Sequence, residues 1–182
     1  EMGVLATPEQ AGVKVVYVSA SLLVPKATKG EFRLVQDFQG LNQHIRNYPS
    51  TSPTIAEAKR ALAASRFFVH LDLSNYFYQS GMSREDIQYL GVIHPYRGLL
   101  VYVVEPQGLR GASEHGYEVL SRIYGDLVEE GKMTRMADSI FPLGNTYEEV
   151  LENYAEVLAR AEKSGLTFNP KKVEICPVDT VL

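Results

Sequence analysis

The chain has 182 residues, 45% of them hydrophobic, which is enough apolar material for one compact core, with or without a smaller lobe. Its 18 Lys and Arg against 22 Asp and Glu give a net charge of −4, which argues against a surface that is basic throughout, although a local basic groove stays compatible with this balance. We find no apolar run long enough to span a membrane and no signal-peptide pattern. The single Cys176 excludes an internal disulfide and favours an intracellular compartment, cytoplasm or nucleus.

The first third of the chain predicts a strand pair followed by a helix. Residues 13–24 are rich in β-branched side chains and predict a strand, and residues 32–38 predict its partner across a turn. Thr54 and Glu57 have capping-box spacing and open a helix that ends at Ala64. The apolar face of this helix carries Ile55, Ala58 and Leu62.

The rest of the chain alternates strands and helices. Expected strands are residues 67–73, two runs within 90–104 broken near 94–98, a run through Asp138 that ends at Pro142, and short runs near 166–168 and 173–176. Expected helices are 112–129 and a helix that opens at Thr146 and stops at Gly165, with Val150, Tyr154, Val157, Leu158 and Ala161 as its stripe. Hairpins join strands as often as helices do, so the fold class is α+β, a mostly antiparallel sheet backed by two or three helices.

Asp72 is the first residue that points to chemistry. In the run from Phe67 to Leu73, the residues Phe68, His70 and Asp72 share one face of a strand, and the apolar residues between them share the other. Asp72 therefore lies at the strand end and points away from the core. A carboxylate there is costly unless a cation pairs with it.

Asp138 is the second such residue, in the run from Met136 to Ile140. The order of elements brings one Asp from a first strand beside another from a later hairpin, which is the palm arrangement of template-directed polymerases. Two divalent ions in such a site clamp the attacking hydroxyl and the triphosphate. Mg²⁺ suits this task because it keeps few protein ligands, and Mn²⁺ is the alternative.

Five motifs, in order, resemble the reverse transcriptases of gypsy-type LTR retrotransposons and retroviruses. They are Phe32 to Phe38 with Leu41-Asn42, Leu71 to Gln79, Pro106 to Leu109, Met136 to Ser139, and Gly165 to Lys172. The resemblance implies a right-hand polymerase fold with residues 1–66 as a fingers-like region and 67–182 as a palm-like region that returns to the fingers at 80–105. The thumb and the RNase H domain are absent from the printed sequence.

The resemblance also implies a role for each matching residue. Asp72 and Asp138, with the Leu73 carbonyl, would hold the metals, and Lys172 would lie near the leaving pyrophosphate. Arg33 and Lys26 would face the triphosphate, since guanidinium and ammonium groups bind phosphate. Phe77 would exclude a ribose 2′-hydroxyl, and Gln107 and Gly108 would contact the incoming nucleotide and the template base. The implied partners are an RNA or DNA primer-template, a deoxynucleoside triphosphate, and further domains or proteins of a longer polyprotein.

Ser139 departs from the resemblance, because the family carries a second adjacent aspartate there. A lost carboxylate that contributed about 3 to 5 kcal/mol to the transition state would slow catalysis by roughly 10² to 10⁴. We therefore expect an RNA-directed DNA polymerase site that is impaired. The alternative is a retroelement-derived, non-catalytic binding or scaffold module. The sequence is compatible both with a natural serine at position 139 and with one introduced deliberately.

Overall fold

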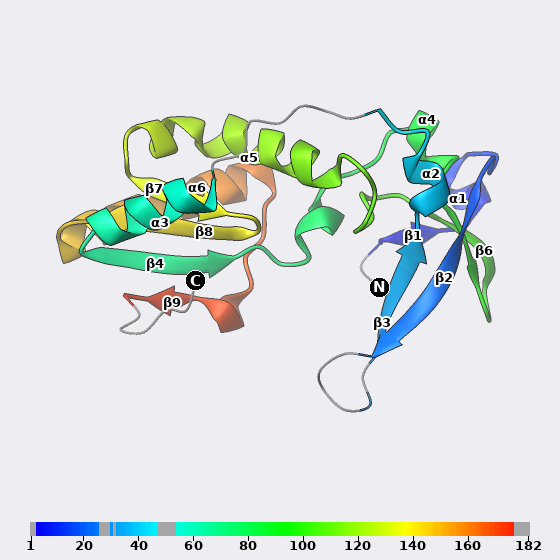
Figure 1. Ribbon diagram of the computed structural model, residues 1–182, viewed down its shortest axis with the longest axis horizontal. Helices are drawn as coiled ribbons and strands as arrows, with labels where there is room; N and C mark the ends of the chain where they lie inside the picture. Colours follow the sequence, from blue (N-terminus) through cyan, green and yellow to red (C-terminus); the bar gives the residue numbers. More distant parts are fainter. Residues whose placement is uncertain (1–2, 26–29, 31, 47–53, 177–182) are drawn as a thin grey trace. The chain divides into compact units, whose positions relative to one another are not determined.

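The computed structural model describes residues 3–25, 30, 32–46 and 54–176, with the backbone only at 33 and 34. Its contacts divide the chain into two compact units, each assembled from two separate stretches. Unit 1 comprises Glu1–Tyr48 and Phe77–Ser113, and unit 2 comprises Pro49–Tyr76 and Glu114–Leu182. Each unit has its own sheet, and each is described by itself (Figure 1).

Unit 1 contains a five-stranded sheet in the order β1-β6-β5-β2-β3. Its strands are β1 (Leu5–Ala6), β2 (Val18–Pro25), β3 (Phe32–Asp37), β5 (Gly91–His94) and β6 (Gly98–Tyr102). The pair β2–β5 is parallel, and the other described pairs of this sheet are antiparallel. Short helices accompany them: α1 (Pro8–Ala11), α2 (Gln39–Asn42), α4 (Arg84–Ile87) and the 3₁₀ helix η1 (Tyr76–Gln79), whose first residue belongs to unit 2.

The first strand is shorter than the sequence predicts. Residues 13–17 are not strand, because the N–H groups of Val16 and Tyr17 donate to the Gln88 carbonyl instead of a neighbouring ladder. The β-branched composition of this segment therefore reflects local packing rather than sheet formation. The two strands expected within 90–104 are confirmed as β5 and β6.

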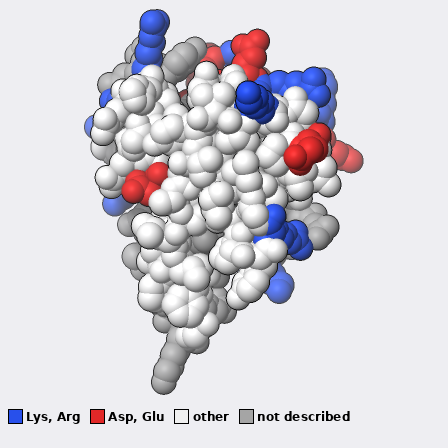
Figure 2. Space-filling model, turned by 90° about the vertical axis from the view of Figure 1, so that its right-hand side faces the viewer, with Lys and Arg blue, Asp and Glu red and all other residues white. Residues whose placement is uncertain are grey.

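One face of the unit 1 sheet is buried and the other keeps apolar side chains in solvent. The buried cluster consists of Phe38, Leu41, Leu90, Val92, Leu100 and Tyr102. Exposed apolar side chains on the opposite face include Val18, Leu22, Val24 and Ile93. Figure 2 shows a side of the molecule on which the described residues are mostly neither basic nor acidic. This view contains no broad basic patch among those residues, in keeping with the charge balance of the sequence.

Unit 2 contains a four-stranded antiparallel sheet in the order β7-β8-β4-β9. Its strands are β4 (Phe67–Asp72), β7 (Met133–Met136), β8 (Ser139–Gly144) and β9 (Glu174–Ile175). Its helices are α3 (Ile55–Ala64), α5 (Ala112–Glu129, which begins in unit 1), α6 (Tyr147–Ser164) and the 3₁₀ helix η2 (Pro170–Lys172). The strand expected at 166–168 is reduced to a single bridge between Leu73 and Phe168.

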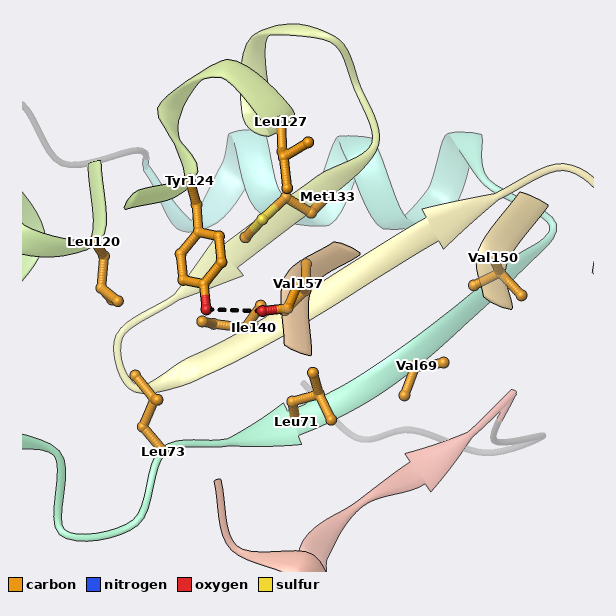
Figure 3. Close-up of a cluster of buried hydrophobic side chains, with 10 residues drawn as sticks. All are labelled: Val69, Leu71, Leu73, Leu120, Tyr124, Leu127, Met133, Ile140, Val150 and Val157. Carbon is orange, nitrogen blue, oxygen red and sulfur yellow. Dashed lines mark hydrogen bonds between the residues drawn. The ribbon is translucent and has the colours of Figure 1, made fainter. Parts of the chain in front are cut away.

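The main core of unit 2 lies between its sheet and the helices α5 and α6 (Figure 3). Val69 and Leu71 of β4 are fully buried there, as the period-two alternation predicts. Tyr124 of α5 is also fully buried, and its hydroxyl donates to the Val157 carbonyl at 3.2 Å. Burial raises the pKa of Tyr124 to about 12, because the charged phenolate is disfavoured away from water. Helix α3 packs with Phe68, Phe141 and Leu143 in a separate small cluster.

Two expected helix faces need correction, while their caps are confirmed. Thr54 and Glu57 form the predicted capping box, and Gly165 adopts the left-handed conformation that ends α6. Ile55, however, is 61% exposed, because it lies in the first turn of α3, beyond the small cluster that packs on this helix. In α6 the buried stripe includes Asn153 and leaves Leu158 exposed. Asn153 is tolerated because its amide donates to the Leu143 carbonyl at 2.7 Å.

The α+β class with mostly antiparallel sheets is confirmed. Among the described residues, no helix combines the length and the apolar character that crossing a membrane requires.

Candidate active site

Asp72 is placed by the alternation of β4. Val69, Leu71 and Leu73 enter the core, so the residue between the last two turns its side chain to the opposite face. The Asp72 side chain is 14% exposed, and its backbone carbonyl accepts from Asn169 N at 2.8 Å. The carboxylate is thus at a strand end whose backbone is held from two sides.

Asp138 lies in the turn between β7 and β8, not within a strand as the sequence predicts. Met136 pairs with Ser139 across this hairpin, which leaves Ala137 and Asp138 as the two turn residues. Ala137 has a φ of 53°, in the left-handed region that a residue with a side chain rarely adopts. The turn geometry overrides the strand pattern because a tight hairpin needs a positive φ at its first position.

The hairpin is joined to the end of β4. Asp72 and Ser139 are direct cross-strand partners, and Leu73 N donates to the Asp138 carbonyl at 3.0 Å. The structure therefore brings the two predicted aspartates to one end of one sheet. Both belong to unit 2.

The side chain of Lys172 forms an ion pair with the Asp72 carboxylate. Asn169 caps the 3₁₀ turn η2 by accepting from Lys171 N, and this turn directs the next lysine toward β4. The Lys172 Nζ atom lies 3.0 Å from each carboxylate oxygen of Asp72. The ammonium therefore neutralises Asp72 symmetrically, and a cation that binds this carboxylate must replace it.

Two residues that the sequence did not assign to the site lie beside it: His70 contacts Ser139, and Glu174 contacts His70. His70 Nε2 lies 3.1 Å from Ser139 Oγ, and His70 Nδ1 lies 3.6 Å from Glu174 Oε2. His70 could have been found, because it shares the strand face of Asp72. Glu174 could not, because the short strand β9 carries no alternation that fixes its register.

Arg135 is buried beneath the hairpin, on the face of β7 that packs against α5. Its guanidinium donates to the Tyr117 carbonyl at 3.1 Å and to Ser121 Oγ at 2.5 Å, and it lies 5.3 Å from the Tyr117 ring. Burial lowers the pKa of Arg135 from its ordinary value. These contacts tie α5 to the strand that leads into Asp138.

The remaining predicted site residues belong to unit 1 or lie outside the described part. Gln107 and Gly108 are exposed in a turn, where Asn42 donates to the Gly108 carbonyl at 3.0 Å. Phe77 is half-buried in η1. Arg33 pairs through its backbone with Val24, and Lys26 lies outside the described residues. The geometry of the candidate site thus comes from unit 2 alone.

The oxygen groups at the sheet end are of the chemical kind that Mg²⁺ prefers. Two carboxylates and a backbone carbonyl are hard oxygen donors, and Mg²⁺ commonly completes such a set with phosphate and water. In the described ranges no group of three or more His, Cys, Asp and Glu side chains is arranged to hold a metal. Asp72, Asp138 and the Leu73 carbonyl would therefore hold an ion together with substrate oxygens rather than enclose it.

Comparison of the sequence with known proteins identifies a matching family. Residues 24–181 match the sequence profile of the family "Reverse transcriptase (RNA-dependent DNA polymerase)". The Tf2-7 and Tf2-8 transposon polyproteins of Schizosaccharomyces pombe are each 26% identical over 153 residues, which is 84% of this chain and 11% of theirs. The chain thus spans about a tenth of the length of these curated relatives.

Solved structures share the fold at lower identity. The foamy viral protease-reverse transcriptase in complex with double-stranded DNA has a TM-score of 0.83 at 18% identity, covering 99% of this chain and 36% of that one. The same protein in complex with an RNA/DNA hybrid has a TM-score of 0.82 at 16% identity, covering 99% and 23%. The profile match over most of the chain, together with the similar transposon polyproteins and the shared fold, leads to one conclusion: this chain belongs to the reverse transcriptase family.

Proposed function

We propose that the chain is the fingers and palm of a reverse transcriptase and that its site performs two-metal nucleotidyl transfer at a reduced rate. In this proposal residues 1–66 and 80–105 form the fingers and the rest of 67–182 forms the palm, so the fingers lie mostly in unit 1 and the palm mostly in unit 2. The observation that carries it is the junction of Asp72 and the Asp138 turn, where Asp72 faces Ser139 across the strands and Leu73 N binds the Asp138 carbonyl.

The proposed substrates are a primer-template of RNA or DNA and a deoxynucleoside triphosphate. Divalent ions, when bound, would neutralise the phosphates and lower the pKa of the primer hydroxyl. Asp72 and Asp138 would position those ions, because their backbones are fixed by the strand pair and by the Leu73–Asp138 hydrogen bond. Lys172 would leave Asp72 and turn its ammonium toward the pyrophosphate group.

The family resemblance assigns roles in substrate binding to residues outside unit 2 as well, and we propose these roles from the resemblance alone. Arg33 and Lys26 would pair with the triphosphate, and Phe77 would exclude a 2′-hydroxyl by its volume. Gln107 and Gly108 would contact the nucleotide and the template base. Gly108 has a φ of 92°, so its left-handed backbone suits glycine and favours a close approach of main chain to ligand.

The reduced rate follows from Ser139. Its hydroxyl is neutral, so the site has one negative charge fewer than a pair of adjacent aspartates would supply. At about 3 to 5 kcal/mol for the missing carboxylate, we expect a rate roughly 10² to 10⁴ below that of an intact site.

Single-nucleotide addition to a primed RNA template tests this function. We expect Ser139→Asp to raise the rate by roughly 10² to 10⁴, and the added Asp72→Asn change to abolish the gain. A wild-type rate in the ordinary range, about 1 to 10³ per second, would contradict the impairment. No gain in Ser139→Asp, together with no binding of Mn²⁺ by the chain, would contradict the site and favour a non-catalytic binding module.

A further inference from the structure

His70 is held in one orientation beside Ser139. Its ring stacks on Phe141 with centroids 5.0 Å apart and planes inclined by 10°, and Phe141 is buried. The ring edge thereby directs Nε2 to Ser139 Oγ at 3.1 Å. Because Phe141 fixes the ring plane, the contact does not depend on a freely rotating side chain.

The other edge of the ring faces a carboxylate. Glu174 is the direct partner of His70 across β4 and β9, and its Oε2 lies 3.6 Å from Nδ1. This separation is longer than a hydrogen bond, so the interaction is electrostatic. A carboxylate only accepts, and a neutral imidazole carries one proton, so the carboxylate favours that proton on Nδ1. Nε2 is then the acceptor, and the Ser139 hydroxyl must be the donor.

The direction of the Ser139–His70 hydrogen bond determines whether the Ser139 hydroxyl presents its proton or its lone pairs toward Asp72. A serine hydroxyl has one proton and two lone pairs, and it rotates to suit its neighbours. When the Ser139 hydroxyl donates its hydrogen bond to His70, the lone pairs of Oγ remain for a cation or for water. These lone pairs lie beside Asp72, because Asp72 is the cross-strand partner of Ser139. Without His70, the same hydroxyl would turn its proton toward the carboxylate and compete with a cation.

We propose that His70, oriented by Phe141 and Glu174, is a positioning residue that makes Ser139 a neutral oxygen ligand at the metal site. The proposal rests on the proposed function, since it assumes that Asp72 and Asp138 bind a divalent ion. It explains how a chain that lacks the second aspartate can retain an oxygen donor at that position.

Mn²⁺ affinity, measured by electron paramagnetic resonance on the whole chain, tests the proposal. His70→Phe keeps an aromatic ring on Phe141 and removes the acceptor, so we expect a loss of affinity of about tenfold. Ser139→Ala should give a similar loss, and the double variant should lose no more than either single one. His70→Gln should restore part of the affinity, because its amide oxygen accepts. The control is His44→Phe, at an exposed histidine in unit 1.

Nitrogen-15 NMR of the neutral His70 ring gives a second measurement that does not depend on metal. We expect the tautomer with the proton on Nδ1, and a shift toward the other tautomer in Glu174→Ala. This readout also serves if His70→Phe fails to fold.

The outcomes separate this proposal from the function on which it rests. An Nε2–H tautomer in the wild type, or Mn²⁺ affinity unchanged in His70→Phe and Ser139→Ala but lost in Asp72→Asn, overturns the role of His70 alone. Failure of the wild type to bind Mn²⁺ at Asp72 overturns the proposed function and this role together.

Discussion

The two faces of the unit 2 sheet use the same strand alternation for opposite purposes. On one face Val69, Leu71 and Ile140 are sealed beneath α5 and α6. On the other, at the Asp72 end, polar side chains meet: Asp72 with Lys172, and Ser139 with His70. The apolar face is stabilised by burial, and the polar end by one ion pair and one hydrogen bond. Substitutions should therefore separate stability from chemistry.

The largest effect is expected at Asp72. In the Ser139→Asp background, Asp72→Asn should lower single-nucleotide addition by about 10³-fold, because it removes a carboxylate that holds the ions. Thermal unfolding should change little, since Asp72 lies outside the core. Asp86→Asn is the control, because this carboxylate lies in unit 1 and accepts a hydrogen bond from Ser83, the N-cap residue of the short helix α4. Equal losses in both variants would mean that the effect is not local to the site.

A substitution within the apolar face should lower stability rather than catalysis. Leu71→Ala should lower the free energy of unfolding by about 2 to 5 kcal/mol, because it leaves a cavity among fully buried side chains. Urea unfolding measures the loss. Leu158→Ala, on the exposed side of α6, should cost far less. A similar cost at both positions would contradict the assignment of the faces.

Tyr124, which lies in the apolar core of unit 2, makes the folding stability depend on pH. Its pKa is about 12 in the folded chain and 10.0 ordinarily, so the unfolded chain loses this proton first as the pH rises. The stabilisation is complete below pH 10 and falls between pH 10 and 12, by on the order of 2 kcal/mol. Urea unfolding of wild type and Tyr124→Phe across this range isolates the contribution. Parallel pH profiles for the two proteins would refute it.

The smallest effect is expected at Arg135, a charge on the otherwise apolar side. Arg135→Met should change the free energy of unfolding by about 1 kcal/mol or less, because relief of desolvation offsets the lost donors to Tyr117 and Ser121. Differential scanning calorimetry measures the change. A loss above about 3 kcal/mol would show that the paired guanidinium is a principal stabilising contact.

The apolar face could be predicted from the sequence because it depends on local periodicity. Val69 and Leu71 follow from alternation alone, and the ends of α3 and α6 follow from Thr54 and Gly165. The buried Asn153 could not be predicted, since it depends on a carbonyl of β8 that only the folded sheet presents.

The polar end was predicted in part. Asp72, Asp138 and Lys172 followed from the family resemblance, and the structure brings Lys172 to Asp72. The turn position of Asp138 was missed because residues 136–140 have a strand-like pattern that the positive φ of Ala137 interrupts. The contacts of His70 with Ser139 and Glu174 join three strands, and no local pattern fixes such a register.

Anomalous diffraction from crystals of the chain grown with Mn²⁺ tests the central claim most directly. We predict a manganese peak within coordination distance of the Asp72 and Asp138 carboxylates, with the Lys172 ammonium displaced from Asp72. A Lys172–Asp72 pair that stays intact at high Mn²⁺ concentration, with no peak at this sheet end, would contradict it.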